Sequence, residues 1–413
     1  MTRKGVWNLQ QTRDKYLQSL WANDVHMYGW GYNVDGTQGT NTTGNPAPGG
    51  SGPSIVASSP IQIGTDANWN SFNGKAGYYS AYFVVTTKTD GTLWSWGRND
   101  HGTLGHNNET KYSSPTQIGS GTDWSSVTSY GNKAVTAVKT DGTLWMWGAN
   151  AYGILGQNES YGPSKQGISS PVQIPGTTWS KAYVGAYSTA ATKTNGQLWM
   201  WGYNNQGQLG QNSILSSPAF GGYSSPVQVP GTTWSKATTG STHTLAIKTD
   251  GTLWAWGAGT AGPLGQNQPN NAHYSSPVQI PGTNWSDTWT TQVRSAAINT
   301  DGELFIWGAN VNGCLGQNQS QSNYDNASSP IQIAGTTWDK FSWLVYGGWS
   351  ATKTDGTLWG CGRLNYGAKL HETVPSDGVS SPIQLGSDST WDSITSWGYG
   401  MTALRSTLTP SQL

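Results

Sequence analysis

One short pattern recurs along the chain and limits its possible folds more than any other feature. The pattern reads K-T-D-G-T-L-W-x-W-G. Three full copies and three variants stand at residues 88–97, 139–148, 248–257, 193–202, 299–308 and 353–362, and a W-G pair without K-T-D-G stands at residues 30–31. The closing glycine therefore falls at positions 31, 97, 148, 202, 257, 308 and 362. The resulting period of 51 to 66 residues is in the range of propellers and solenoids.

Two further elements follow this pattern in a fixed order. The first is G-x-L-G or a variant of it, as at residues 102–105 and 153–156. The second is S-S-P-x-Q followed by an apolar residue, and a tryptophan comes soon after it. These tryptophans stand at positions 69, 124, 179, 234, 285, 338 and 391. Seven copies of this element predict seven repeats.

Each repeat is predicted to form β-strands. Asp-Gly between two short alternating segments is a strong signal for a two-residue hairpin turn, in which both turn residues adopt positive φ. The S-S-P element supplies a further strand, with its proline at the strand's start, where a missing N–H is tolerated. Seven radial sheets of about four strands each would form a closed propeller, which also removes most exposed sheet edges.

The two ends of the repeat region complement each other. The chain enters it with only the second hairpin arm, at residues 26–31, and leaves it with only the first, at residues 401–405. Pairing these arms would complete the seventh blade. The predicted fold class is therefore all-β, a seven-bladed β-propeller of repeats 51–66 residues long, closed by pairing of the N- and C-terminal strands and preceded by a short N-terminal helix.

This reading divides the chain into a docking segment at 1–25, a propeller at 26–406 and a tail at 407–413. The helix expected in the docking segment has Asn8 as its cap and carries an apolar stripe. The stripe either packs on a face of the propeller or docks the propeller on another subunit. The predicted docking residues are Trp7, Leu9, Tyr16, Leu17, Leu20 and Trp21.

The charge balance excludes two classes of partner. The chain has 21 Lys and Arg against 21 Asp and Glu, without a basic block. Nucleic-acid binding and polybasic membrane association both need such a block, and no apolar run reaches the roughly 18 residues of a membrane span. We therefore expect no nucleic-acid partner and no membrane insertion.

Cys314 and Cys361 match neither a disulfide framework nor a zinc pattern and are expected to be buried apolar residues.

No catalytic constellation stands out, so the chain is predicted not to be an enzyme and to need no metal or cofactor. Its six histidines show no metal-ligand spacing. Neither a nucleophile elbow with a partner nor a phosphate-binding Walker loop is present. The repeated aspartates, such as Asp90 and Asp141, are explained by the hairpin turns. An enzyme acting on polysaccharide would need two carboxylates brought together from distant blades.

Length variation is concentrated between G-x-L-G and S-S-P, in loops that include residues 40–57 and 157–168. Equivalent loops leave the same side of a propeller, and variable loops on a rigid scaffold carry recognition. The predicted ligand-face residues are Tyr161, Tyr324, Asn158 and Asn318.

Tryptophans at repeat positions are assigned to core packing. Four others are assigned to extra blade packing: Trp289, Trp343, Trp349 and Trp397.

Together, D-G-x-(apolar)-x-x-W-G and G-x-L-G resemble the repeats of the regulator of chromosome condensation. The resemblance covers residues 26–406 and implies a seven-bladed propeller. Proteins with these repeats include a nucleotide-exchange factor for a small GTPase, a secreted inhibitor of β-lactamases and many uncharacterised bacterial and viral proteins. The basic tail and the wedge of the exchange factor have no counterpart here, so the resemblance does not imply that activity.

The opening G-V-W-N-L-Q-Q at residues 5–11 resembles the first segments of structural and tail proteins of marine bacteriophages. We therefore predict a non-enzymatic component of a phage virion, in the tail or associated with the capsid. Its N-terminal helix would bind other virion proteins, and its variable loops a host-surface glycan or protein. The alternative is a secreted or cell-surface bacterial binding module, similar to a lectin or a protein inhibitor.

Overall fold

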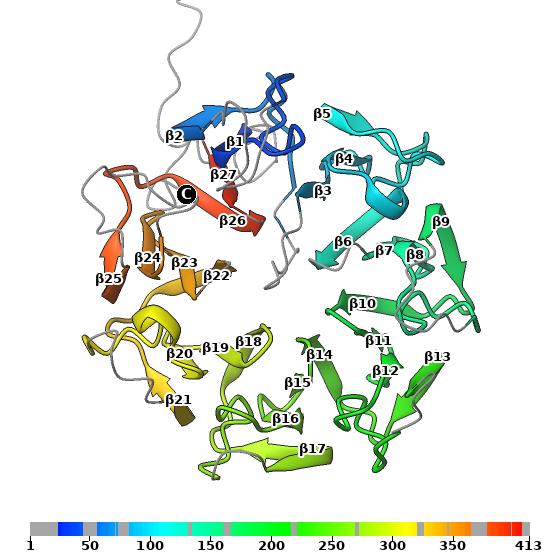
Figure 1. Cartoon of the computed structure of the whole chain (residues 1–413), viewed down its shortest axis with the longest axis vertical. Coiled ribbons are helices and arrows are strands. Elements are labelled where there is room, and N and C mark those ends of the chain that lie inside the picture. Colours follow the sequence, from blue (N-terminus) through cyan, green and yellow to red (C-terminus); the bar gives the residue numbers. More distant parts are fainter. Residues whose placement is uncertain are drawn as a thin grey trace, which may run out of the picture.

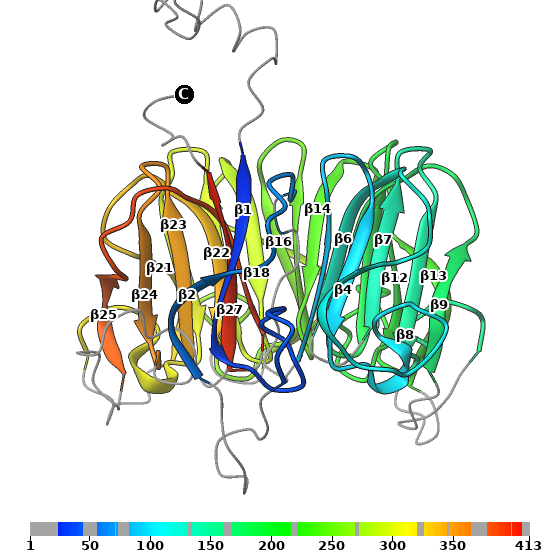
Figure 2. The ribbon, with the colours of Figure 1, turned by 90° about the horizontal axis from the view of Figure 1, so that it is seen from above.

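A computed structural model describes most of the chain: residues 24–43, 56–70, 72, 82–130, 134–159, 167–215, 221–268, 272–319, 326–344, 347–364, 378–397 and 399–406. In this part of the chain, 27 strands form seven sheets, six of them four-stranded and one three-stranded. The sheets stand as blades around a central axis (Figure 1), and their strands run roughly along that axis (Figure 2). The predicted all-β, seven-bladed propeller is confirmed.

In blades 1 to 6, the strands follow one another in sequence order from the axis outward, as Figure 1 shows. Blade 1 contains β3 (Phe83–Thr87), β4 (Leu93–Gly97) and β5 (Tyr112–Gln117), and blade 2 contains β6 (Trp124–Tyr130), β7 (Ala134–Lys139), β8 (Leu144–Ala149) and β9 (Gly167–Ile174). Blade 3 contains β10 (Trp179–Val184), β11 (Ser188–Lys193), β12 (Leu198–Tyr203) and β13 (Gly222–Val229), and blade 4 contains β14 (Trp234–Thr239), β15 (His243–Lys248), β16 (Leu253–Ala258) and β17 (His273–Ile280).

Blade 5 contains β18 (Trp285–Thr290), β19 (Arg294–Asn299), β20 (Leu304–Gly308) and β21 (Ala327–Gln332), and blade 6 contains β22 (Trp338–Leu344), β23 (Gly348–Lys353), β24 (Leu358–Gly362) and β25 (Val379–Gln384). Two short 3-10 helices, η1 (Asp100–Gly102) and η2 (Val311–Gly313), follow β4 and β20. In the part of the chain that is described, no helix has the length and apolar character needed to span a bilayer.

Blade 7 closes the ring from both ends of the chain. Its inner strands are β26 (Trp391–Trp397) and β27 (Gly400–Ser406), and its outer strands are β1 (Val25–Tyr32) and β2 (Val56–Gln62). Antiparallel pairing of β1 with β27 extends from Val25 opposite Ser406 to Gly31 opposite Gly400. The predicted closure is thus confirmed. The docking segment and tail lie outside the described residues apart from Asp24 and Val25, so the three-part division stays a prediction.

The hairpin turn of the K-T-D-G pattern is one residue longer than predicted. In blade 2, Lys139 donates its N–H to Thr143 O over 2.9 Å, and Gly142 donates its N–H to Lys139 O over 3.0 Å. Gly142 alone has positive φ, at 78°, whereas Asp141 does not. This geometry is a type I turn followed by a left-handed glycine. The prediction of positive φ at both turn residues is wrong, because the Asp141 carboxylate stabilises the turn by accepting hydrogen bonds from Thr143.

The proline of S-S-P lies within its strand rather than at the start. In blade 2, β9 begins at Gly167, so Pro171 is well inside it. A register shift in the β8–β9 pairing lies between Met146 and Gly148. Pro171 falls in the segment that this shift leaves unpaired, and β9 is the outermost strand of its sheet, so no ladder hydrogen bond requires an N–H at this position. The edge position, rather than the strand's start, is what tolerates the proline.

Adjacent blades are joined by the second tryptophan of W-x-W-G. Trp147 is fully buried and donates its indole N–H to the carbonyl of Thr103 in blade 1 over 2.9 Å. A Cβ on Gly105 would lie 2.9 Å from the same indole nitrogen, so only glycine lets the G-x-L-G segment approach this closely. The same bond links Trp96 to Thr37, Trp201 to Ile154, Trp256 to Gln208 and Trp307 to Pro263.

Blade 6 lacks this tryptophan and compensates for its loss. Cys361 stands at the position, and Trp349 lies opposite it on the neighbouring strand β23. Trp349 donates its indole N–H to Cys314 O over 2.8 Å, which restores the bond to the preceding blade. Like the other three tryptophans assigned to extra packing, Trp349 is at most 4% exposed, so that assignment is confirmed: Trp289, Trp343, Trp349 and Trp397.

Candidate functional site

The repeated aspartates contribute to the turns. Asp141 accepts hydrogen bonds from the backbone N–H of Thr143 at 2.9 Å and from its hydroxyl at 2.7 Å. The hydrogen bond from the Thr143 hydroxyl is the main cause of a pKa below the usual aspartate range. Asp90 and Asp250 make the same bonds to their own threonines. Within the described residues, no group of three or more His, Cys, Asp or Glu is placed to hold a metal ion.

Two potentially reactive groups are enclosed in the core. His243 is fully buried, and burial lowers its pKa from 6.5 to about 4. Its Nε2 lies 3.0 Å from the Ser295 hydroxyl oxygen. Burial raises the pKa of the Cys361 thiol far above its usual value, so this cysteine stays a protonated, unreactive thiol. Cys314 is also buried, and neither cysteine is in a disulfide.

Asn158 and Asn318, predicted to face a ligand, join adjacent blades. Asn158 has a φ of 59° and donates its backbone N–H to Ser224 O of the next blade over 2.8 Å, while its Oδ1 accepts from Ser225 at 3.2 Å. Asn318, with a φ of 55°, donates to Ser380 O over 2.7 Å. Asparagine tolerates this left-handed conformation better than most residues.

The backbone bond recurs at Asn41, Asn107, Asn212 and Asn267. Ligand contact by Asn158 and Asn318 stays a prediction. The other predicted site residues lie outside the described part of the chain: Tyr161, Tyr324 and the docking residues Trp7, Leu9, Tyr16, Leu17, Leu20 and Trp21.

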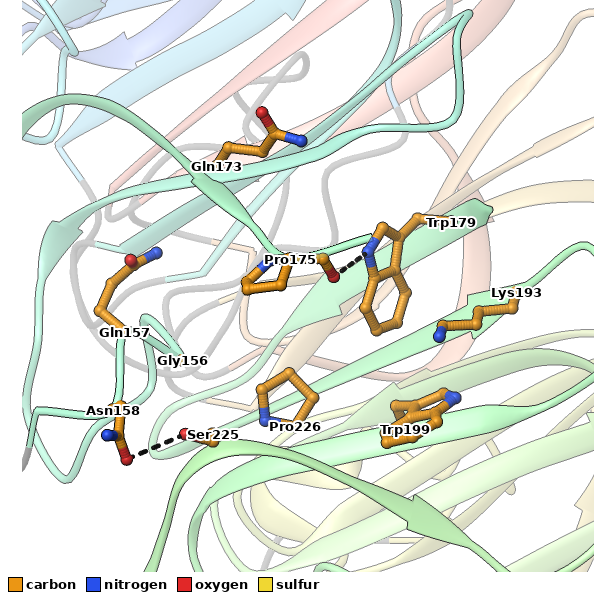
Figure 3. A pocket seen from close by; sticks show the side chains of 10 residues that line it. All are labelled: Gly156, Gln157, Asn158, Gln173, Pro175, Trp179, Lys193, Trp199, Ser225 and Pro226. Carbon is orange, nitrogen blue, oxygen red and sulfur yellow. Dashed lines mark hydrogen bonds between the residues drawn. The ribbon is translucent and has the colours of Figure 1, made fainter. Parts of the chain in front are cut away.

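The Asn158 loop forms one wall of a pocket of about 360 Å³, here called the 2/3 pocket because it opens between the outer strands of blades 2 and 3 (Figure 3). The opposite wall carries Trp179 and Trp199, whose ring centroids are 6.3 Å apart in an edge-to-face arrangement. The ammonium of Lys193 lies 4.8 Å from the first ring and 4.5 Å from the second. Amide side chains, including Gln173, complete the lining.

We call this unit of two aromatic rings and a cation a cradle, and it recurs around the propeller. In blades 1, 2, 3, 4 and 6, the lysine ammonium lies 3.8 to 5.1 Å from the centroids of both rings. Blade 7 uses Arg405 over Tyr28 and Trp391 at 5.9 and 5.8 Å. Cations at these distances are attracted by the negative ring faces. The lysines are Lys88, Lys139, Lys193, Lys248 and Lys353.

Blade 5 departs from this arrangement. Its cradle position holds Asn299, and the aromatic pair is Trp285 with Phe305, 5.0 Å apart. These residues line a pocket of about 550 Å³ between blades 4 and 5, here called the 4/5 pocket. Asp301 and Glu303 also line it, so this pocket carries two carboxylates where the 2/3 pocket carries an ammonium.

Sequence reasoning missed both pockets. It assigned the aromatic residues of K-T-D-G-T-L-W to packing and examined the loops for ligand contacts. A signal was nevertheless present in the aligned repeats, where residues 299–305 read N-T-D-G-E-L-F against K-T-D-G-T-L-W in blades 1, 2, 4 and 6. The proximity of Gln279 in blade 4 to this segment of blade 5 was not visible, because the two come together only when the blades pack.

The fold and the repeated W-x-W-G and G-x-L-G elements define a seven-bladed propeller of the repeat type found in the regulator of chromosome condensation. A family model described as the RCC1-like domain matches residues 18–352. The chain belongs to this family, as its repeats predicted.

Relatives with curated names support the assignment. The chain is 30% identical over 238 residues to RCC1 domain-containing protein RUG3, mitochondrial, of Arabidopsis thaliana, with 54% of this chain and 51% of that protein covered. It is 28% identical over 264 residues to human Protein RCC2, with 57% and 49% covered. The chain thus spans about half the length of these curated relatives.

Solved structures show the same fold. Human WBSCR16 superimposes with a TM-score of 0.71 at 18% identity, covering 92% of this chain and 98% of that one. Yeast RCC1 (Prp20), in its structure bound to Kap60, gives a TM-score of 0.74 at 16% identity, covering 100% and 96%. At these identities the likeness concerns the fold alone.

The prediction of a phage virion component is wrong, because the family relationship connects this chain to proteins of a plant and of animals. The predictions of virion partners, host attachment and a virion location are wrong for the same reason, as is the alternative of a secreted or cell-surface bacterial module. The phage resemblance rested on residues 5–11 alone. So short a match carries far less information than a repeat pattern matched over residues 18–352.

Proposed function

We propose that this chain is a non-catalytic protein-binding propeller that holds peptide segments of partner proteins in the pockets between its outer strands. The observation that carries the proposal is the recurrence of one kind of pocket with different charge. The 2/3 and 4/5 pockets share aromatic, amide and proline residues but differ in the charged groups of their cradles. A rigid frame with variable polar groups suits the recognition of particular side chains.

The chemistry of the described residues supports a binding role. Asp90, Asp141 and Asp250 are engaged in their turns, and His243 and Cys361 are buried. The family also includes human E3 ubiquitin-protein ligase HERC2, but this chain covers only 5% of that protein. So small a share gives no reason to transfer the ligase activity to this chain.

Proteins of the same fold bind other proteins. Yeast RCC1 (Prp20) has been crystallised with Kap60, and the structure of Prp20p was described with its binding to Gsp1p and histones. These partners belong to those proteins. What they support for this chain is the kind of role, which is recognition of protein surfaces by a propeller. Regulation of a partner through such binding is the form of activity that we propose.

The test is to probe an array of synthetic peptides of varied sequence with the purified full-length chain. Pocket-filling substitutions at two exposed positions, Gln173→Trp and Gln279→Trp, are compared with Glu109→Trp on an exposed loop of blade 1. We expect a distinct subset of peptides to bind, with the pocket substitutions together weakening binding at least about tenfold, a loss of about 1.4 kcal/mol. The control should bind as the unsubstituted chain does. Absence of peptide binding, or equal binding by all variants, would refute the proposal.

A further inference from the structure

The cradle of blade 5 differs from those of blades 1, 2, 4 and 6 at three positions. Lysine is replaced by Asn299, threonine by Glu303 and tryptophan by Phe305. The first change removes the ammonium, the second adds a carboxylate and the third removes ring volume. The first two changes make the pocket more acidic, and the third makes one of its rings smaller. The pocket measures about 550 Å³, against about 360 Å³ for the 2/3 pocket.

The two carboxylates of this pocket are held by neutral groups. Glu303 Oε2 accepts from the amide of Asn299 at 2.7 Å, and its Oε1 accepts from Gln332 at 3.0 Å. Asp301 Oδ2 accepts from Asn284 at 2.6 Å. Within the described residues, neither carboxylate forms an ion pair with Lys, Arg or His within 4.0 Å. Their negative charge is therefore oriented by hydrogen bonds but not neutralised.

Blade 3 has the opposite distribution of charge. It retains Lys193 over its two tryptophans but has Asn195 and Gln197 at the positions of Asp301 and Glu303. The same frame thus occurs with a cation beside two amides in blade 3 and with an amide beside two carboxylates in blade 5. The two pockets consequently differ in the charge that they present to a side chain entering them.

We propose that the 4/5 pocket binds a lysine side chain of a basic segment of a partner protein. The lysine ammonium would take the place that the chain's own lysine occupies in five other blades, near Trp285 and Phe305 and within reach of Asp301 and Glu303. Charge complementarity supports this occupant, because a cation between an aromatic face and an unneutralised carboxylate gains from both. The inference rests on the proposed function and names one partner chemistry for it.

The decisive variant is Asn299→Lys, which installs the residue that five other blades already accommodate at this position. It should keep the fold, since the chain packs this residue five times elsewhere, and its ammonium should fill the pocket. We expect it to abolish binding of a lysine-containing peptide. Glu303→Gln removes one negative charge with little change in shape and should weaken binding about fivefold, in the range of a partly exposed ion pair.

A matched control comes from blade 3. Lys193→Asn empties the cradle of the 2/3 pocket, but Asn195 and Gln197 supply no negative charge there. This variant should therefore gain no second site for the lysine peptide. On the ligand side, replacing lysine by its uncharged isostere norleucine should weaken binding at least about tenfold, and added salt should weaken binding of the lysine peptide as it screens the charges.

The measurement is isothermal titration of the full-length chain and its variants with lysine and norleucine peptides of otherwise identical sequence. Equal affinity for the two peptides, or undiminished binding by Asn299→Lys, would overturn the proposal. So would competition by spermidine at the affinity of the peptide, which would make a free polyamine the occupant. If peptides without lysine bind in the array and the lysine peptide does not, only this inference fails. If no peptide binds at all, the proposed function fails with it.

Discussion

Lowering the pH from 7 to 5 should weaken the fold through one buried side chain, His243. This residue begins β15 and is fully buried. The Ser295 hydroxyl donates to Pro263 O over 2.7 Å, so its oxygen is available to accept a hydrogen bond from His243 Nε2 at 3.0 Å. This arrangement suits the neutral imidazole with its proton on Nε2. A second proton would place a charge in the core between blades 4 and 5, where burial disfavours the charged form.

The size of the effect follows from the pKa in the two states. Burial lowers the His243 pKa from 6.5 to about 4 in the folded chain, so the unfolded chain takes up the proton first as the pH falls. The stability contributed by the neutral ring is fully present above pH 6.5 and is lost progressively between pH 6.5 and 4. Each pKa unit corresponds to about 1.4 kcal/mol, which gives a loss of about 2 kcal/mol at pH 5 and about 3 kcal/mol at most.

The assay is urea unfolding followed by tryptophan fluorescence at pH 7, 6 and 5, for the original chain and for His243→Gln. Glutamine retains an N–H donor but does not ionise in this range. Burial also lowers the pKa of His106, so part of the pH dependence should remain in the variant. The difference between the two proteins in how the free energy of unfolding depends on pH gives the contribution of His243. The same pH dependence in both proteins would refute the reasoning.

Two further predictions concern interblade packing and ring closure. Trp349→Phe should destabilise the chain by about 1–2 kcal/mol, because Cys314 O loses its donor. The double variant Trp349→Val with Cys361→Trp, which copies Val135 opposite Trp147 in blade 2, should recover much of that loss in urea unfolding; no recovery would contradict the compensation. Ending the chain at residue 399 removes β27 and should cost more than about 3 kcal/mol, whereas deleting residues 1–23 should leave a folded propeller. Thermal melts of the two truncations test this, and a more stable C-terminal truncation would disprove it.

The sequence alone was sufficient for the fold and for ring closure. Both depend on features repeated in every blade, so one reading of the pattern applies seven times, and the split repeat at the termini leaves only one way to complete the ring. The burial of Trp147 and its equivalents was equally predictable, since they alternate with smaller residues along a strand. The N-terminal motif was misleading because it is short and occurs once.

The local turn geometry and the pockets were decided by the tertiary structure. Asp-Gly is compatible with several hairpin turns, and the hydrogen bonds made by Asp141 select one of them. The sequence placed Asn158 in a variable loop, and only the packing of blade 3 against blade 2 shows that it forms hydrogen bonds with two serines of blade 3. The 4/5 pocket combines Gln279 of one blade with Glu303 of the next, and neither blade contains a pocket by itself. Sequence periodicity determines the strands and the buried face of each blade. The pockets between two blades depend on the residues in which the repeats differ, because these residues meet only when the blades pack together.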